Sequence, residues 1–206
     1  MPAAAWRSII LFVSGTVIVV VITVSVLAYL GFKRLNASLT SAPVVAANAV
    51  PCDQLEHTQV HYHAALQIVY HGVVTNLRQN TGIMTGSSGN VSCYYYLHVH
   101  PQDTNVIHIE SPRNETFTLG QFIDVWNAWS QANGYGAVKL DSAHVAQFTL
   151  AGGDAIKVYI DQGDGKGPQP YTGDPRSIVL KSHEVITVEI SPPDQPPPPF
   201  TFPAGL

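Results

Sequence analysis

Three segments of the chain alternate apolar and polar residues with a period of two, and the polar side of each carries histidines. Successive side chains of a β-strand point to opposite faces of the sheet, so residues i and i+2 share a face. The segments are residues 60–70, 93–100 and 106–110, and their histidines are His61, His63, His98, His100 and His108. The pattern predicts three strands that carry apolar side chains on one face and imidazoles on the other.

One amphipathic helix is predicted after the third strand. Thr118 is a suitable N-cap, and Gln121 stands three residues later, where it completes a capping box. Apolar residues then recur at helical spacing, namely Phe122, Val125, Trp126 and Trp129. The pair Asn133-Gly134 is typical of a helix end. We expect the apolar stripe of this helix to cover the apolar face of the sheet.

Weaker strand patterns flank these elements. Residues 73–77 follow a turn at His71-Gly72, and residues 156–161 and 186–190 again alternate apolar and polar side chains. The glycine-rich stretch 161–167 lacks the residue order of a calcium or phosphate loop and favours a hairpin loop. Strands, one helix and then strands indicate an α+β fold, with a β-grasp-like mixed β-sheet covered on one face by a single helix. A small Greek-key β-barrel is the alternative.

Residues 8–32 carry no charge and are long enough to cross a bilayer, which takes about 20 apolar residues. This run exceeds the apolar core of a cleaved signal peptide, so we predict an uncleaved, single-pass transmembrane helix. It divides the chain into an N-terminal flank (1–7), the membrane helix (8–32), a linker (33–51), a His-rich domain (52–191) and a proline-rich tail (192–206). We expect the tail to be extended and to lie apart from the core.

The charges beside the membrane run do not fix its orientation, because Arg7 precedes it and Lys33 and Arg34 follow it. The domain and tail, residues 52–206, carry all 14 acidic residues but only seven of the ten Lys and Arg, so their net charge is −7. An acidic domain argues against nucleic acid as a partner. Cys52 and Cys93 suit one disulfide in an oxidising compartment, with thiolate ligation of a metal as the alternative. We therefore predict a domain outside the cytoplasm, at the cell membrane.

The five strand histidines predict a transition-metal site. Neutral imidazole is a good ligand for copper and zinc, and same-face neighbours on adjacent strands lie about 5 Å apart. Asp103 and Glu110 are candidate ligands, or acceptors that orient the imidazoles from behind. A merely solvated face is the competing interpretation, and a single histidine would favour it. His57, His144 and His183 have no partner at ligand spacing, and His71 ends its strand, so none of them joins the predicted site.

Three classes of function are compatible with this pattern. We expect a domain that holds, senses or transfers copper or zinc, with no catalytic residues. A metal-dependent enzyme would use the same histidines and keep one coordination position open. A metal-free interaction module would dock a protein partner through the histidine face or the proline-rich tail. A pocket around the metal favours the enzyme, whereas a saturated or open cluster favours binding.

Four motifs resemble a poorly characterised family of membrane-anchored or secreted prokaryotic proteins with His-rich domains. They are H-Y-H-A-A-L, C-Y-Y-Y-L-H-V-H, I-H-I-E-S-P and F-T-L-G-Q-F-I-D-V-W, and they extend over about residues 52–190. The resemblance implies that His61, His63, His98, His100 and His108 act as one unit. It implies no particular activity.

Overall fold

The computed structural model describes residues 23–27, 29 and 50–206, and the chain divides into two compact units, Met1–Val44 and Val45–Leu206. In the first unit, residues 23–27 and 29 are helical. Most of the predicted membrane segment, 8–32, and nearly all of the linker lie outside the described residues. Within the described part, no helix reaches the length and apolar character needed to span a bilayer.

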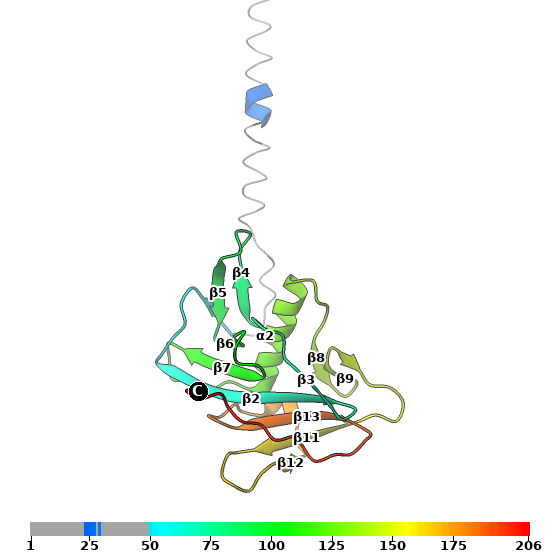
Figure 1. The fold of residues 1–206 in the computed structure, drawn as a ribbon. Coiled ribbons are helices and arrows are strands. Elements are labelled where there is room, and N and C mark those ends of the chain that lie inside the picture. The colour runs from blue at the N-terminus through cyan, green and yellow to red at the C-terminus, as the bar shows by residue number, and fades with distance from the viewer. Residues whose placement is uncertain (1–22, 28, 30–49) are drawn as a thin grey trace, which may run out of the picture. The chain divides into compact units, whose positions relative to one another are not determined.

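A mixed sheet of seven strands organises the second unit (Figure 1). Only β13 and β2 pair in parallel, and the other pairs are antiparallel. The sheet runs from β12 to β6 without closing, so the β-barrel alternative is wrong. In order across the sheet the strands are β12 (Gln169–Tyr171), β11 (Ala155–Asp161), β13 (Val185–Ser191), β2 (Val60–Tyr70), β7 (Val106–Ser111) and β6 (Leu97–His98), with β3 (Val73–Thr75) paired to β2.

Two sheets of three short strands flank the large one, and the sequence pattern did not predict them. One orders as β10 (Phe148–Thr149), β9 (His144–Ala146) and β8 (Lys139–Asp141); the other as β1 (Cys52–Asp53), β5 (Val91–Tyr95) and β4 (Ile83–Thr85). The chain also forms a short 3₁₀ helix, Pro175–Ser177. The glycine-rich stretch 161–167 joins β11 to β12 as the predicted hairpin loop.

The predicted strand 93–100 is divided at Tyr96 into β5 and β6, which belong to different sheets. The Tyr96 amide donates to the Pro51 carbonyl instead of to a strand partner. Gly82 permits the division because it has no Cβ atom. A Cβ atom at this position would lie 2.5 Å from the Leu97 carbonyl oxygen, which is too close. The predicted disulfide between Cys52 and Cys93 is confirmed, and it ties β1 to β5.

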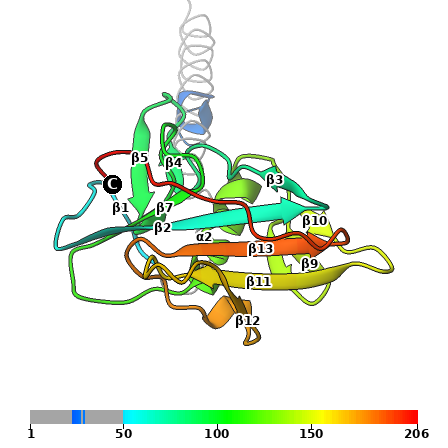
Figure 2. The same ribbon diagram turned by 60° about the horizontal axis from the view of Figure 1, so that its bottom comes forward.

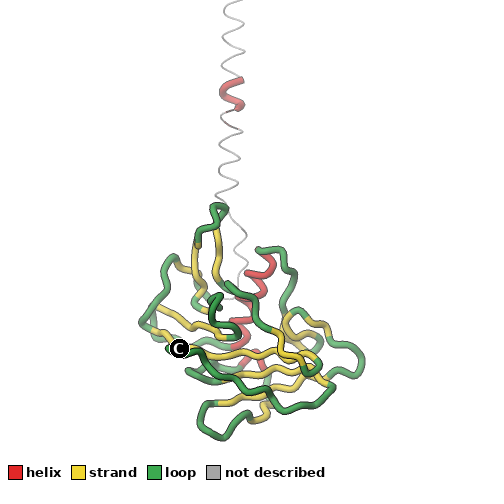
Figure 3. Tube along the Cα trace, in the orientation of Figure 1, coloured by secondary structure: helices red, strands yellow, loops and turns green. Residues whose placement is uncertain are grey.

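The helix α2 (Leu119–Ala132) covers one face of the sheet, and it is drawn in red beside the yellow strands of the domain in Figure 3. Its predicted capping box is present: the Thr118 side chain accepts from the Gln121 amide, and the Gln121 side chain accepts from the Thr118 amide. Its apolar stripe is buried against the apolar side chains of β2, β7 and β13. The Trp129 indole also donates to the carbonyl of Ile83.

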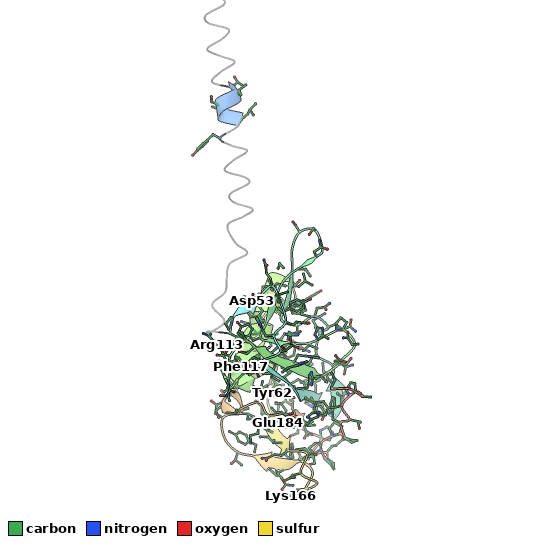
Figure 4. The ribbon with its side chains drawn as sticks, turned by 90° about the vertical axis from the view of Figure 1, so that its left-hand side faces the viewer. Asp53, Tyr62, Arg113, Phe117, Lys166 and Glu184 are labelled. Atoms are coloured by element: carbon green, nitrogen blue, oxygen red, sulfur yellow. A yellow bond between two sulfur atoms is a disulfide. The ribbon has the colours of Figure 1, made fainter. Side chains whose placement is uncertain are left out.

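The apolar face is closed at the start of β2 by polar contacts. Tyr62, labelled above Glu184 in Figure 4, donates its hydroxyl to the Leu180 carbonyl. Burial and the neighbouring Glu184 raise the pKa of Tyr62 above its ordinary value. Burial likewise raises the pKa of Glu184, whose carboxylate accepts from the Lys181 amide. These bonds anchor the start of β13 to β2.

The proline-rich tail, predicted to lie apart from the core, packs on the sheet face opposite α2 (Figure 2). The Gln195 amide donates to Glu189 of β13, and Asp194 pairs with Lys157 of β11. The ring of Phe202 contacts that of His183 at 5.0 Å between centroids. A proline-rich segment has no periodicity that would reveal such packing, because its contacts come from scattered backbone and side-chain groups.

Candidate metal centre

Strand register lines up the histidines in a row across three strands. In the antiparallel pairs, His63 of β2 stands opposite His108 of β7, and His98 of β6 stands opposite the same His108. Directly opposite residues share a face, with Cβ atoms about 4.5–5.5 Å apart. In the neighbouring position, His61 stands opposite Glu110. The pairing therefore brings four of the predicted histidines and one predicted carboxylate to the same face.

His108 lies at the middle of the cluster. Its ring centroid is 4.5 Å from that of His63 and 6.4 Å from that of His61. On the other side it is 5.5 Å from His98 and 4.4 Å from His100, which follows β6. Two pairs of histidines, each in an H-x-H sequence, thus flank one central imidazole.

The donor atoms form two overlapping groups that could hold a metal ion. One consists of His98, His100, His108 and Glu110, and the other of His61, His63 and His108. Within each group the ligand atoms lie within 4.8 Å of one another. Ligands of one zinc ion lie about 2.0–2.2 Å from the metal, so small side-chain movements would complete either group.

Hydrogen bonds orient two of the imidazoles from behind, as metal-binding histidines require. The Nδ1 atom of His98 is 2.8 Å from the Tyr95 carbonyl, which accepts its proton and leaves Nε2 with a lone pair. That Nε2 atom faces the Nε2 atom of His100 at 3.2 Å. On the central ring, Nε2 of His108 lies 3.2 Å from the Asp103 carboxylate, in the orienting position predicted for Asp103.

Two further carboxylates border the cluster. The Oε1 atom of Glu110 lies 3.3 Å from Nε2 of His61 and 3.7 Å from Nδ1 of His108. Glu56, which sequence reasoning missed, lies 3.0 Å from Nε2 of His100 and 3.6 Å from Nε2 of His98. No sequence spacing reveals Glu56, because it reaches the cluster from the loop between β1 and β2. The disulfide ties β1, which precedes this loop, to the strand before β6.

Unpaired polar atoms are concentrated in the cluster. Across residues 23–27, 29 and 50–206, five buried side-chain nitrogen or oxygen atoms lack a hydrogen-bond partner. Three of the five are Nε2 of His63, Nδ1 of His108 and Oε2 of Glu110. Leaving a buried polar atom unsatisfied costs about 1–3 kcal/mol. His63 and His108 belong to one ligand group, and His108 and Glu110 to the other, so metal binding in these groups would give the three atoms partners.

The protonation states suit a cation. Burial, followed by the charges of neighbouring histidines, lowers the pKa of His63 to about 4. Burial lowers the pKa of His98 to about 4 as well, and burial also lowers that of His100. For Glu110, burial acts to raise the pKa, but the adjacent His108 and the charges of nearby imidazoles outweigh it and lower the pKa. At neutral pH these histidines are neutral and Glu110 is ionised, the forms that bind metals.

The remaining histidines lie outside both groups. His57 pairs with Asp53, and His144 pairs with Asp141. His183 contacts the tail, although its backbone amide donates to the His63 carbonyl. His71 pairs with Asp154 and bonds to the Pro192 carbonyl at the far end of β2.

Comparisons of the chain with known proteins find no match. No protein-family model matches the chain. No curated protein and no solved structure matches it either. Its function must therefore be argued from the cluster itself.

Proposed function

We propose that this protein is a membrane-tethered, extracytoplasmic domain that binds copper or zinc through its histidine cluster. The observation that carries the proposal is the set of three buried, unpartnered donor atoms on His63, His108 and Glu110. Buried polar groups are normally hydrogen-bonded, and exceptions call for an explanation such as an ion. Here the exceptions coincide with the largest gathering of imidazoles in the described residues.

The chemistry of the donors narrows the choice of metal. Both cysteines are used in the disulfide, so the cluster offers imidazole nitrogens and carboxylate oxygens and no thiolate. Imidazole suits zinc and Cu²⁺, whereas soft sulfur ligands select Cu⁺. The domain is therefore proposed to take Zn²⁺ or Cu²⁺ and to hold, sense or transfer it.

Burial of the ligands supports binding over catalysis. His63, His98, His108 and Glu110 are all buried, and the cluster meets solvent mainly at His61 and at the pair His100 and Glu56. A cavity of about 660 Å³ lies elsewhere, beside β11 and β12, and is lined by residues such as Tyr159 and Tyr171. A catalytic metal needs an open position that faces a substrate cavity. We therefore place the metal-dependent enzyme second.

The disulfide and the net negative charge of the domain support the proposed location outside the cytoplasm. Disulfides persist in oxidising compartments, which lie outside the cytoplasm. The apolar run 8–32 would tether the domain to the membrane, consistent with the resemblance to anchored His-rich domains. A partner that binds through the tail would first have to displace it from β13, because Gln195 and Asp194 already contact the sheet.

The test is metal analysis of the full chain, purified in detergent without a histidine tag. We expect tight, stoichiometric binding of Cu²⁺ or Zn²⁺ by calorimetry and elemental analysis. Replacing one outer ligand and the central ligand, with His98→Ala and His108→Ala, should weaken binding at least about 100-fold, since metal affinity depends on the full ligand set. His144→Ala is the matched control, because the His144 side chain bonds with its neighbour Asp141 and lies outside both ligand groups. Equal affinity in the double variant, or no binding by the natural chain, would refute the proposal.

A further inference from the structure

We infer that the cluster holds two metal ions, bridged by the carboxylate of Glu110. The inference rests on the proposed metal binding and adds a second site with its own ligands. One ion would lie between His98, His100, Glu56 and Glu110. The other would lie between His61, His63, His108 and the same Glu110.

The number of donors is the first reason. Five imidazoles and two carboxylates line one cluster, whereas zinc usually takes four ligands. The ring contacts divide the imidazoles into the pair His61 and His63 and the pair His98 and His100, each in contact with His108. A single ion bound to one pair would leave the other pair without a metal. Two ions use every imidazole.

The hydrogen bond of His108 decides which ion it binds. Its Nε2 atom is held by Asp103, so it can offer only Nδ1 and cannot bridge two ions through both nitrogens. The His61 and His63 pair needs this Nδ1 as its third imidazole, completing the second of the two ligand groups. The His98 and His100 pair does not need it, because Glu56 lies 3.0 Å and 3.6 Å from their Nε2 atoms.

Glu110 is placed to join the two ions. Its Oε1 atom already lies 3.3 Å from His61 and 3.7 Å from Nδ1 of His108. Its Oε2 atom is buried without a partner, and the residue also belongs to the ligand group of His98 and His100. Two-metal sites in proteins commonly hold their ions about 3.5–4 Å apart, the spacing that a bridging carboxylate suits. A buried carboxylate would also offset part of the charge of two cations.

Copper is the probe, because two bridged Cu²⁺ ions couple magnetically and lose electron paramagnetic resonance intensity. We expect the full chain to bind about two Cu²⁺ ions, with a signal per copper that falls as the second ion enters. His61→Ala with His63→Ala should leave one ion with full signal, and His98→Ala with His100→Ala should do the same on the other side. Glu110→Gln preserves the side-chain size and should abolish the coupling. His71→Asn with His144→Ala is the control pair and should retain both ions and the coupling.

The outcomes separate this inference from the proposed function. One ion per chain, or two ions without magnetic coupling in the natural protein, would overturn the two-metal centre and leave metal binding intact. No bound copper and no bound zinc would remove both. Circular dichroism of each variant shows whether a lost ion reflects a lost ligand or a lost fold, and Glu110→Gln supplies the test if the double variants unfold.

Discussion

The two faces of the large sheet are buried in different ways. On the helix side, apolar residues such as Leu66 and Ile186 pack with Phe122 of α2, and all three are fully buried. On the other side, His63, Gln67 and Glu189 are also buried, yet all are polar. The first arrangement is explained by the hydrophobic effect alone. The second arrangement requires a partner for every buried polar atom. The polar face is therefore the one that indicates function.

The polar face is itself divided. Under the tail, Thr187 donates to Gln67, and the Gln195 amide donates to Glu189, so most polar groups have partners. At the other end, the histidine cluster holds three of the five unpartnered buried atoms among the described residues. The tail bonds to one half, although Oε2 of Glu189 there is also buried without a partner, whereas the other half lacks such a cover. The proposed metal site would account for this difference.

The largest loss of stability should come from the helix side. Phe122→Ala removes a fully buried ring from the core, and such changes typically cost about 3–5 kcal/mol in the free energy of unfolding. Chemical denaturation measures the loss, with Val91→Ala at an exposed position as the control. Metal stoichiometry should not change in folded protein. A cost below about 1 kcal/mol would mean that α2 does not close this face.

The disulfide ties β1 to β5 within one of the small sheets, and it should matter nearly as much. Replacing Cys52 and Cys93 by serine opens a loop that spans 41 positions, and losing such a bond typically costs about 2–4 kcal/mol. Because the bond precedes the loop that carries Glu56, the variant should also bind metal more weakly. Thiol labelling of denatured, unreduced natural protein should detect no free cysteine. Two labelled thiols would contradict the bond and restore thiolate ligation as an alternative.

Acid should weaken the polar face selectively. In metal-free protein, the pKa of His98 is about 4, below the ordinary value of about 6.5 that applies to the unfolded chain. The unfolded state therefore takes up the proton first, and stability falls as pH drops from about 6.5 to about 4. For His98 this amounts to about 3 kcal/mol, at about 1.4 kcal/mol per pH unit. His100, His108 and Glu110 face this ring and modulate the shift.

Unfolding with a chelator present, at steps between pH 7 and pH 4, measures this effect. His98→Gln should flatten the slope in that window, leaving the contribution of His63, whose pKa is also about 4. Phe122→Ala should lower stability equally at every pH, because no titrating group is changed. A slope unaltered by His98→Gln would show that His98 is not held neutral in the folded state.

Local sequence patterns predicted which residues lie on each face of the sheet, but not which distant segments pack against those faces. The alternation in residues 60–70 and 106–110 placed His61, His63, His108 and Glu110 on one side because the strand period is two. The capping box of Thr118 and Gln121 marked the start of α2 for similarly local reasons. The parallel pairing of β2 with β13 joins residues more than 100 positions apart, and no local pattern specifies it.

Glu56 and the tail escaped prediction for the same physical reason. Both reach their positions through irregular segments whose contacts depend on elements distant in sequence. Glu189 illustrates the difficulty, since an alternating glutamate in β13 is typical of a solvated face, yet it is buried under the tail. Likewise, the division of strand 93–100 at Tyr96 depends on the distant Pro51 and Gly82.

The smallest effect should follow removal of the tail, and it tests whether the two halves of the polar face are independent. Cutting the chain after Pro193 removes the exposed pairing of Asp194 with Lys157 and the bond from Gln195 to Glu189, which the tail buries. The groups left behind can bond to water, so we expect a loss of about 1–2 kcal/mol, measured as a lower Tm.

Metal affinity should stay within about threefold, because no ligand is lost and the His183 amide still donates to the His63 carbonyl. A loss equal to that of Phe122→Ala would make the tail part of the core. A large drop in metal affinity would show that the tail helps to close the cluster, and the two halves would then form one site.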